Sequence, residues 1–108
     1  MDTISRDELK QAIDQNGDLR LIEVLAPKAY KDWHLPGAEN VPLSESFEER
    51  IQQAVPNRSE RVVVYCANTD CPASAKAAQK MEALGYENVA DYVEGKADWK
   101  AAGLPTES

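Results

Sequence analysis

The chain has 108 residues, of which 43% are hydrophobic and 29% are charged, the balance of an ordinary folded domain. Its net charge of -7 at pH 7 argues against nucleic acid and anionic membrane surfaces, because both attract basic patches. The longest apolar run is far shorter than the roughly 20 residues of a membrane span, and the N-terminus lacks the apolar stretch of a secretory signal. We therefore expect a single domain over residues 1–108, cytoplasmic, with no nucleic-acid or membrane partner.

The first half of the chain alternates helix and strand signals. Residues 5–8 (SRDE) form a capping box that predicts a helix to about Asp14, ended by residues 16–17 (NG). A second capping box at residues 46–49 (SFEE) predicts a helix to about Val55. Between them the pattern predicts a strand, a short helix, a turn and a second strand, at residues 20–25, 27–33, 35–38 and 39–43.

The second half continues the alternation. The apolar, largely β-branched residues 62–65 predict a central strand that is buried on both faces. A helix over residues 72–84, a strand over 88–93 and a helix over 96–102 follow. Because strands alternate with helices throughout, the pattern predicts an α/β fold, a parallel sheet with helices on both faces.

Cys66 directly follows the most apolar predicted strand, and ligands of parallel sheets bind beyond the carboxyl ends of the strands. A thiol reacts as its thiolate, and the free N–H groups of a helix N-terminus lower a thiol pKa. The loop after Cys66 runs into the predicted helix over residues 72–84, so backbone amides could stabilise a sulfur anion there. Inert packing of a buried cysteine is the competing interpretation.

Three segments of the chain resemble the single-domain rhodaneses, a family of sulfurtransferases. They read LIEVLAPKAYKDWHLPGAENVPL, VVVYCANTDC…SAKAAQKMEALGYENV and VEGKADWKAAGLP, at residues 21–43, 62–89 and 93–105. The resemblance implies a rhodanese-like three-layer α/β/α fold with a five-stranded parallel sheet. It also implies that Cys66 is the nucleophile, which takes sulfane sulfur from a donor, holds it as a persulfide and passes it to a thiol or another nucleophile.

The resemblance further implies that the loop after Cys66 binds the substrate, with its backbone amides around the persulfide. These loop residues are Ala67, Asn68, Thr69, Asp70, Cys71, Pro72, Ala73 and Ser74. The loop is longer than is usual in the family and contains no cation, while Lys76 at helical spacing should point to solvent. Thiosulfate therefore lacks its usual clamp, and we expect a small persulfide donor or a persulfide-bearing protein, with a thiol as acceptor. The missing arginine also argues against a phosphatase or an arsenate reductase.

Other positions depart from the family pattern. Glu23 and Leu25 stand where the family has an aspartate and an arginine, so Glu23 could keep the acidic role while Leu25 cannot replace the arginine's hydrogen bonds. Lys96, in place of a family glycine, is a candidate for the missing positive charge. We interpret His34, the one histidine, as hydrogen-bonded to backbone rather than as an acid or base.

Cys71 inside the loop has two interpretations. It is a resolving thiol that attacks a Cys66 persulfide or sulfenic acid and yields a disulfide, or it is a small side chain that fills the loop. The alternative to an enzyme is a non-catalytic rhodanese-like module that binds a partner or senses redox state through Cys66 and Cys71. A structural zinc site is not expected, because such sites usually take four ligands and His34 is remote in sequence from the two cysteines. The resemblance implies no metal or organic cofactor, because the protein itself carries the sulfur.

Overall fold

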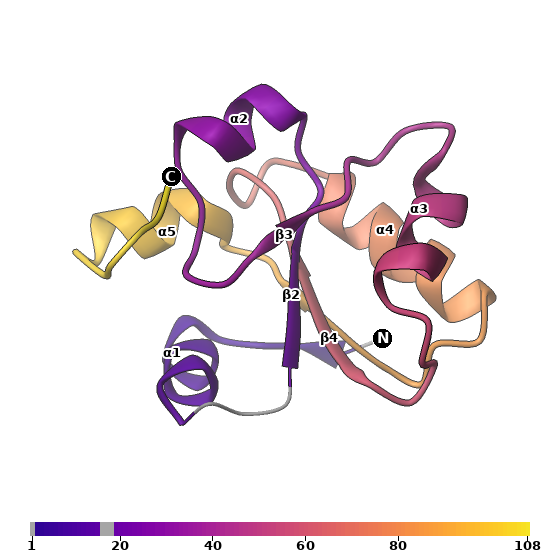
Figure 1. The fold of residues 1–108 in the computed structure, drawn as a ribbon. Helices are drawn as coiled ribbons and strands as arrows, with labels where there is room; N and C mark the ends of the chain where they lie inside the picture. Colours follow the sequence, from indigo (N-terminus) through magenta and orange to yellow (C-terminus); the bar gives the residue numbers. More distant parts are fainter. Residues whose placement is uncertain (1, 16–18) are drawn as a thin grey trace.

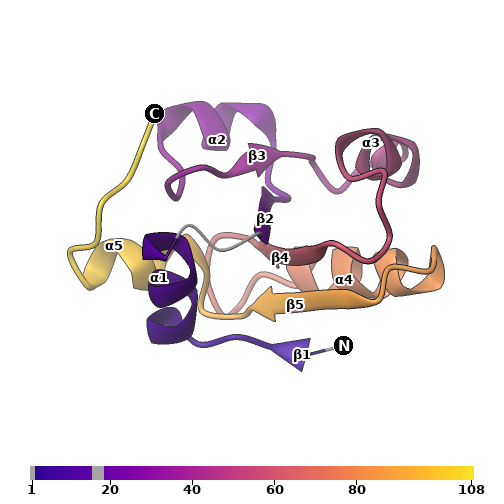
Figure 2. The ribbon, with the colours of Figure 1, turned by 60° about the horizontal axis from the view of Figure 1, so that its bottom comes forward.

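The computed structural model describes residues 2–15 and 19–108. Figure 1 shows the fold, and Figure 2 labels every strand of its sheet. Within these residues, five parallel strands form one sheet in the order β1-β5-β4-β2-β3. The strands are β1 (Asp2–Thr3), β2 (Leu19–Glu23), β3 (Glu39–Asn40), β4 (Arg61–Tyr65) and β5 (Asn88–Tyr92). The helices are α1 (Arg6–Asp14), α2 (Pro27–Asp32), α3 (Phe47–Ala54), α4 (Ala73–Ala83) and α5 (Gly95–Ala101). The predicted five-stranded α/β architecture is confirmed.

The sheet separates two hydrophobic cores, and different helices close each of them (Figures 1 and 2). Helices α3 and α4 cover one face through Phe47, Ile51, Ala77, Ala78 and Met81. Helices α1 and α5 cover the other face, mainly through Leu9 and Trp99. Both faces of the central strands are therefore buried from solvent, and this explains the unbroken apolar sequence of β4.

Successive side chains of β4 point to opposite faces, and this alternation places the cysteine. Val62 and Val64 belong to the core under α3 and α4, and Cys66 continues the same series. Val63 and Tyr65 belong to the core under α1 and α5. Cys66 therefore leaves the carboxyl end of the central strand on the side where α4 begins.

Two strands differ from the sequence prediction. β1 has only two exposed residues, too few to produce a periodic signal, although the resemblance implied a fifth strand. β3 ends at Asn40, three residues before the predicted end at Leu43. The chain still follows the edge of β2 beyond that point: the Val41 N–H donates to the Glu23 carbonyl at 3.1 Å, and the Leu43 N–H donates to the Val24 carbonyl at 2.9 Å.

The two predicted capping boxes have different outcomes. At the start of α1 the Ser5 hydroxyl accepts the Glu8 N–H at 3.2 Å and the Glu8 carboxylate accepts the Ser5 N–H at 3.3 Å, so this box is confirmed. The second box is wrong: α3 begins at Phe47, but Ser46 makes no side-chain cap, because its hydroxyl is paired with that of Ser44 at 3.2 Å. The predicted stop of α1 at residues 16–17 lies outside the described residues.

Candidate active site

Cys66 is buried at the junction between β4 and the loop that leads to α4. Its side chain is only 1% exposed. The thiol donates toward the Cys71 carbonyl at 3.3 Å and toward the Ser74 hydroxyl at 3.4 Å. Burial raises the pKa of the Cys66 thiol, and the hydroxyl and backbone N–H of Ser74 offset only part of this rise. The helix N-terminus thus reaches the sulfur as expected, but the desolvation of a buried thiolate outweighs it.

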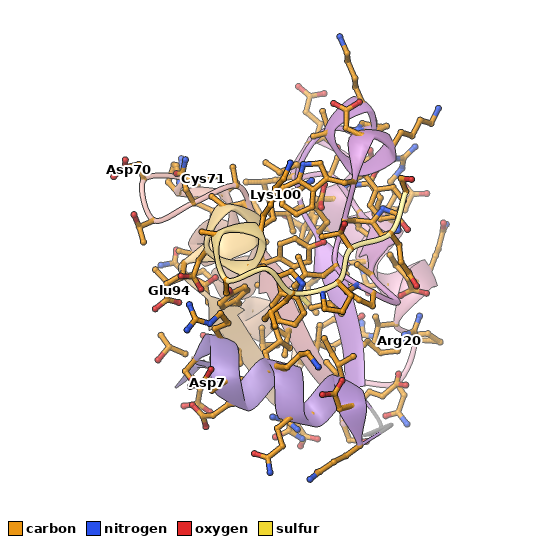
Figure 3. All side chains as sticks on the ribbon, turned by 90° about the vertical axis from the view of Figure 1, so that its left-hand side faces the viewer. Asp7, Arg20, Asp70, Cys71, Glu94 and Lys100 are labelled. Carbon is orange, nitrogen blue, oxygen red and sulfur yellow. The ribbon has the colours of Figure 1, made fainter. Side chains whose placement is uncertain are left out.

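Cys71 is the second thiol of the site and the more accessible one. Figure 3 shows it on the loop beside Asp70. Burial opposes ionisation here too, but the Cys66 thiol and the backbone N–H groups of Ala67 and Ala73 hydrogen-bond the sulfur, and together they lower the pKa of Cys71. The loop amides that the sequence predicted around Cys66 therefore lie in good part around Cys71.

The outer turn of the loop faces solvent. The Asn68 carbonyl accepts the Cys71 N–H at 3.1 Å, and the Asn68 side-chain oxygen accepts the Asp70 N–H at 3.0 Å. Asn68, Thr69 and Asp70 are exposed, as is Pro72, which precedes α4. Of the eight predicted loop residues, only Ala67, Ala73 and Ser74 direct groups at the two sulfurs, together with Cys71 itself.

Helix α5 fixes the start of the loop through its first residues. The backbone N–H of Lys96 donates to the Cys66 carbonyl at 3.0 Å, and that of Ala97 donates to the Ala67 carbonyl at 2.9 Å. Gly95 allows this approach, because its φ is +70° and a Cβ there would lie 2.5 Å from the Cys66 carbonyl oxygen. The sequence places Gly95 at a predicted strand end, near the rim of the pocket, but it does not predict this contact with Cys66.

Lys96 does not turn its charge toward the thiols. Its ammonium is buried and lies 3.0 Å from the Glu23 carboxylate, and it donates to the carbonyls of Ala29 at 3.1 Å and Trp33 at 2.6 Å. The Tyr65 hydroxyl donates to the same carboxylate at 2.8 Å, and burial together with the Glu23 charge raises the pKa of Tyr65. We call Glu23, Tyr65 and Lys96 the ion-pair cluster; Glu23 keeps an acidic structural role in it.

Beside the ion-pair cluster, a hollow of about 300 Å³ lies between α2, the loop and the start of α5. Leu25, which replaces the expected arginine, and Trp33 give the hollow apolar walls. The lining residues are Leu25, Ala29, Asp32, Trp33, Ala67, Asn68, Lys96 and Ala97. Since Lys96 is neutralised by Glu23, and Lys76 on α4 is exposed as expected, neither lysine offers a free cation to an anion at the thiols.

Asp91 on β5 is a residue that sequence reasoning missed. The pairing of β5 with β4 sets Asp91 beside Val64, and alternation along β5 turns it to the α4 side, where Val89 also packs. Its carboxyl is buried, and burial raises its pKa while the Ser74 hydroxyl partly stabilises the charged form. We call Cys66, Cys71, Ser74 and Asp91 the thiol cluster. No signal in a strand sequence shows that an aspartate lies beside cysteines of another strand and loop.

His34 has the structural role that the sequence predicted. Its Nδ1 is hydrogen-bonded to the Tyr30 carbonyl at 2.8 Å, and its ring stacks on that of Tyr30 with the centroids 3.8 Å apart. In the parts of the chain that the structure describes, no three His, Cys, Asp or Glu side chains group as metal ligands. None of the described helices has the length and apolar character to cross a membrane.

Comparison with known proteins agrees with this geometry. The sequence model described as "Rhodanese-like domain" matches residues 5–102. The chain belongs to the rhodanese-like domain family. The solution structure of the rhodanese-like domain of the Anabaena sp. Alr3790 protein superimposes with a TM-score of 0.86 at 26% identity, over 100% of this chain and 80% of that one.

Two curated relatives of this rhodanese-like chain have different names. Thiosulfate sulfurtransferase PspE of Escherichia coli is 38% identical over 68 residues, which are 63% of this chain and 62% of that protein. An HTH-type transcriptional regulator of Mycobacterium tuberculosis is 30% identical over 106 residues, which are 98% of this chain and 45% of the regulator. The chain thus spans less than two thirds of each relative, and the family contains both an enzyme and a regulator.

Proposed function

We propose that this chain is a sulfurtransferase that carries sulfane sulfur as a persulfide on Cys66. The observation that supports this most is the place of Cys66 at the carboxyl end of the central strand, with the hydroxyl and backbone N–H of Ser74 directed at its sulfur. Ligands of parallel sheets bind at this edge, and the groups of Ser74 can hydrogen-bond a sulfur anion there without a charged side chain. The membership of a sulfurtransferase in the same family agrees with the proposal.

The donor is a persulfide on a small thiol or on a partner protein rather than thiosulfate, and the acceptor is a thiol. Thiosulfate is a dianion that needs a cationic clamp. Residues 66–74 contain no lysine or arginine, and the ammonium of Lys96 is taken by Glu23. Sulfur transfer from a persulfide donor develops only one negative charge, and backbone N–H groups can stabilise that charge. The exposed Asn68, Thr69 and Asp70 form the surface that such a donor meets first.

A second candidate is a redox-sensing module in which Cys66 and Cys71 form a disulfide. The approach of the Cys66 thiol to the Cys71 backbone carbonyl, at 3.3 Å, favours it, because Cys71 is then a candidate resolving thiol for an oxidised Cys66. The family membership of a transcriptional regulator favours it as well. Both candidates use the same sulfur atoms, and they differ in whether the stable product is a persulfide or a disulfide.

Intact-mass spectrometry separates the two candidates. The wild-type chain and Cys66→Ser are incubated with glutathione persulfide and, separately, with thiosulfate. Sulfur transfer predicts a gain of one sulfur atom that peptide mapping locates on Cys66 of the wild-type chain, that disappears on addition of a thiol, and that forms faster from the persulfide than from thiosulfate. A Cys71→Ser variant is the control for the disulfide alone, because it keeps Cys66 and cannot form the internal disulfide.

The other outcomes are equally specific. A loss of two hydrogen atoms that needs both cysteines would replace the sulfurtransferase by the redox-sensing module. If neither donor changed the mass of the chain, both the sulfurtransferase and the redox-sensing module would be excluded. A faster reaction with thiosulfate than with the persulfide would contradict the proposed donor class while keeping the persulfide on Cys66.

A further inference from the structure

Asp91 is a buried carboxylate with an unused acceptor. Its side chain is only 3% exposed, and its Oδ1 atom has no hydrogen-bond partner among the residues that the structure describes. A buried acceptor without a partner is unfavourable, so natural proteins keep few of them. The charged and titratable groups that act on it are Glu94, two residues after β5, and the Cys71 thiol, and Glu94 is exposed. Asp91 lies where a proton acceptor for a thiol is needed.

Ser74 connects Asp91 to Cys66. The Cys66 thiol donates toward the Ser74 hydroxyl at 3.4 Å. Asp91 lies beside Val64 on the same face of the sheet, and the Ser74 hydroxyl favours its charged form. Ser74 itself is 2% exposed. A hydroxyl both accepts and donates, so it can take the thiol proton while giving its own to the carboxylate.

The two thiols differ in their exposure to solvent and in the groups around their sulfur atoms. Cys71 is partly exposed, and the Cys66 thiol and the backbone N–H groups of Ala67 and Ala73 lower the pKa of its thiol. Cys66 is buried beneath it, in contact with Cys71 and with Ser74. An external donor therefore meets Cys71 first, and a sulfur on Cys71 lies next to Cys66.

We propose that Cys71 is the outer thiol that takes sulfur from the donor, and that Cys66 then attacks this sulfur while its proton passes through Ser74 to Asp91. In the first step the Cys71 thiolate bonds to the outer sulfur of a persulfide R–S–SH, and the donor leaves as the thiolate R–S⁻. In the second step Cys66 bonds to that sulfur and the bond from the sulfur to Cys71 breaks. The electron pair returns to Cys71, which is again a thiolate, and Asp91 holds the proton. No external oxidant or reductant is consumed.

The carboxylate is needed because Cys66 is shielded from water. Releasing its proton to solvent would place a buried thiolate beside a buried carboxylate, two like charges with little water between them. Transfer to Asp91 keeps the total charge of the pair constant during the attack. Asp91 assists as a general base through the Ser74 hydroxyl. It does not touch the donor, so its role is to position and receive the Cys66 proton.

This inference rests on the proposed function, and its test is therefore made without any sulfur donor. The full chain is mixed with dithiodipyridine, a neutral disulfide whose released thiopyridone absorbs light. Attack by Cys71 releases one equivalent and leaves a mixed disulfide. Attack by Cys66 on that disulfide releases a second equivalent, and this second phase requires the same loss of the Cys66 proton. A chain that failed to transfer sulfur would still show both phases.

The expected result is a fast first phase that Cys71→Ser abolishes and Cys66→Ser retains. Asp91→Asn should slow the second phase at least about tenfold near pH 7 and make it rise with pH, because hydroxide must then remove the proton. Ser74→Ala should have the same effect, and Ser74→Thr should restore most of the rate because it keeps the hydroxyl. Glu94→Gln is the matched control: it removes a nearby exposed charge, keeps the acceptor, and should change the second phase by less than about twofold.

Two results would overturn the proposal. The first is a mixed disulfide that peptide mapping locates on Cys66 rather than Cys71. The second is an Asp91→Asn chain whose second phase is unchanged or faster, since a carboxylate that acts only by its charge opposes thiolate formation and its removal would accelerate the attack. If the amplitude and the rate of the first phase are unchanged in the same measurement, the loop around Cys71 is still folded in the variant.

Discussion

The ion-pair cluster and the thiol cluster lie on opposite faces of the sheet, near the same end of β4. Tyr65 and Cys66 are consecutive residues, and alternation sends one to each cluster. In the ion-pair cluster, Glu23 is fully buried and its carboxylate accepts from both Tyr65 and Lys96. In the thiol cluster, one oxygen of Asp91 has no partner within the described chain.

This difference suits the ion-pair cluster to a structural role and the thiol cluster to a reactive one. A buried charge whose hydrogen bonds are all made holds its neighbours in one arrangement and has nothing left to exchange. A buried carboxylate with an unused acceptor costs stability and is free to take a proton. The ion-pair cluster joins β2, β4 and the start of α5, whose first amides hold the loop. One face therefore fixes the loop, and the other face of the same strand performs the reaction.

Breaking the ion-pair cluster should have the largest effect on stability. Lys96→Met leaves the Glu23 carboxylate buried without its counter-ion, and we expect a loss of about 3–5 kcal/mol in the free energy of unfolding, measured by urea denaturation. Both Lys96 and Lys100 lie over the Trp33 ring, at 4.6 Å and 5.1 Å from its centroid. Lys100→Met is therefore the matched control: Lys100 is exposed, and its loss should cost no more than about 1 kcal/mol. Adding Glu23→Gln to Lys96→Met should recover part of the loss. Equal effects of the two lysine variants would show that Lys96 acts through Trp33 alone.

Separating the loop from α5 should have the next largest effect. Gly95→Ala places a Cβ against the Cys66 carbonyl at a positive φ, and we expect a loss of about 3 kcal/mol together with slower alkylation of Cys71. Gly103→Ala is the control, since Gly103 has a φ of +75° but a Cβ there meets no atom within 4 Å. It should lose about 1 kcal/mol from backbone strain alone and leave Cys71 alkylation unchanged. Similar losses from both variants would mean that the contact with Cys66 is relieved without cost.

The sequence was sufficient for the parts of the fold that depend on local pattern. The apolar run of β4, the capping box at Ser5 and the glycine and proline stops predict most elements, and the strand end predicts the position of Cys66. The two exposed residues of β1 carry no such pattern. Ser46 matches a capping box by composition, but its hydroxyl pairs with Ser44 instead of capping α3.

The site was harder to predict because it depends on register and burial. Lys96 was correctly placed near the loop, yet only the packing of β2 against α5 decides that its charge goes to Glu23. The direction of each thiol pKa follows from burial and from which amides the loop turns inward. Asp91 enters the site through the pairing of β5 with β4, a relation between residues far apart in sequence.

Asp91→Asn should have the smallest effect on stability, and its sign should be opposite to the others. Because burial raises the pKa of Asp91 in the folded state, the folded protein loses stability as the pH rises from the unfolded value of about 3.9 through that raised pKa. Asparagine has the same shape and no such penalty, so we expect the variant to gain about 1 kcal/mol at pH 7 and almost nothing at pH 4, measured by thermal unfolding at both values. A variant less stable than wild type at pH 7 would mean that the charged carboxylate is satisfied, and the two clusters would then be alike. A variant that is more stable but slower in the attack by Cys66 would show that Asp91 lowers the stability of the fold while it accelerates the reaction.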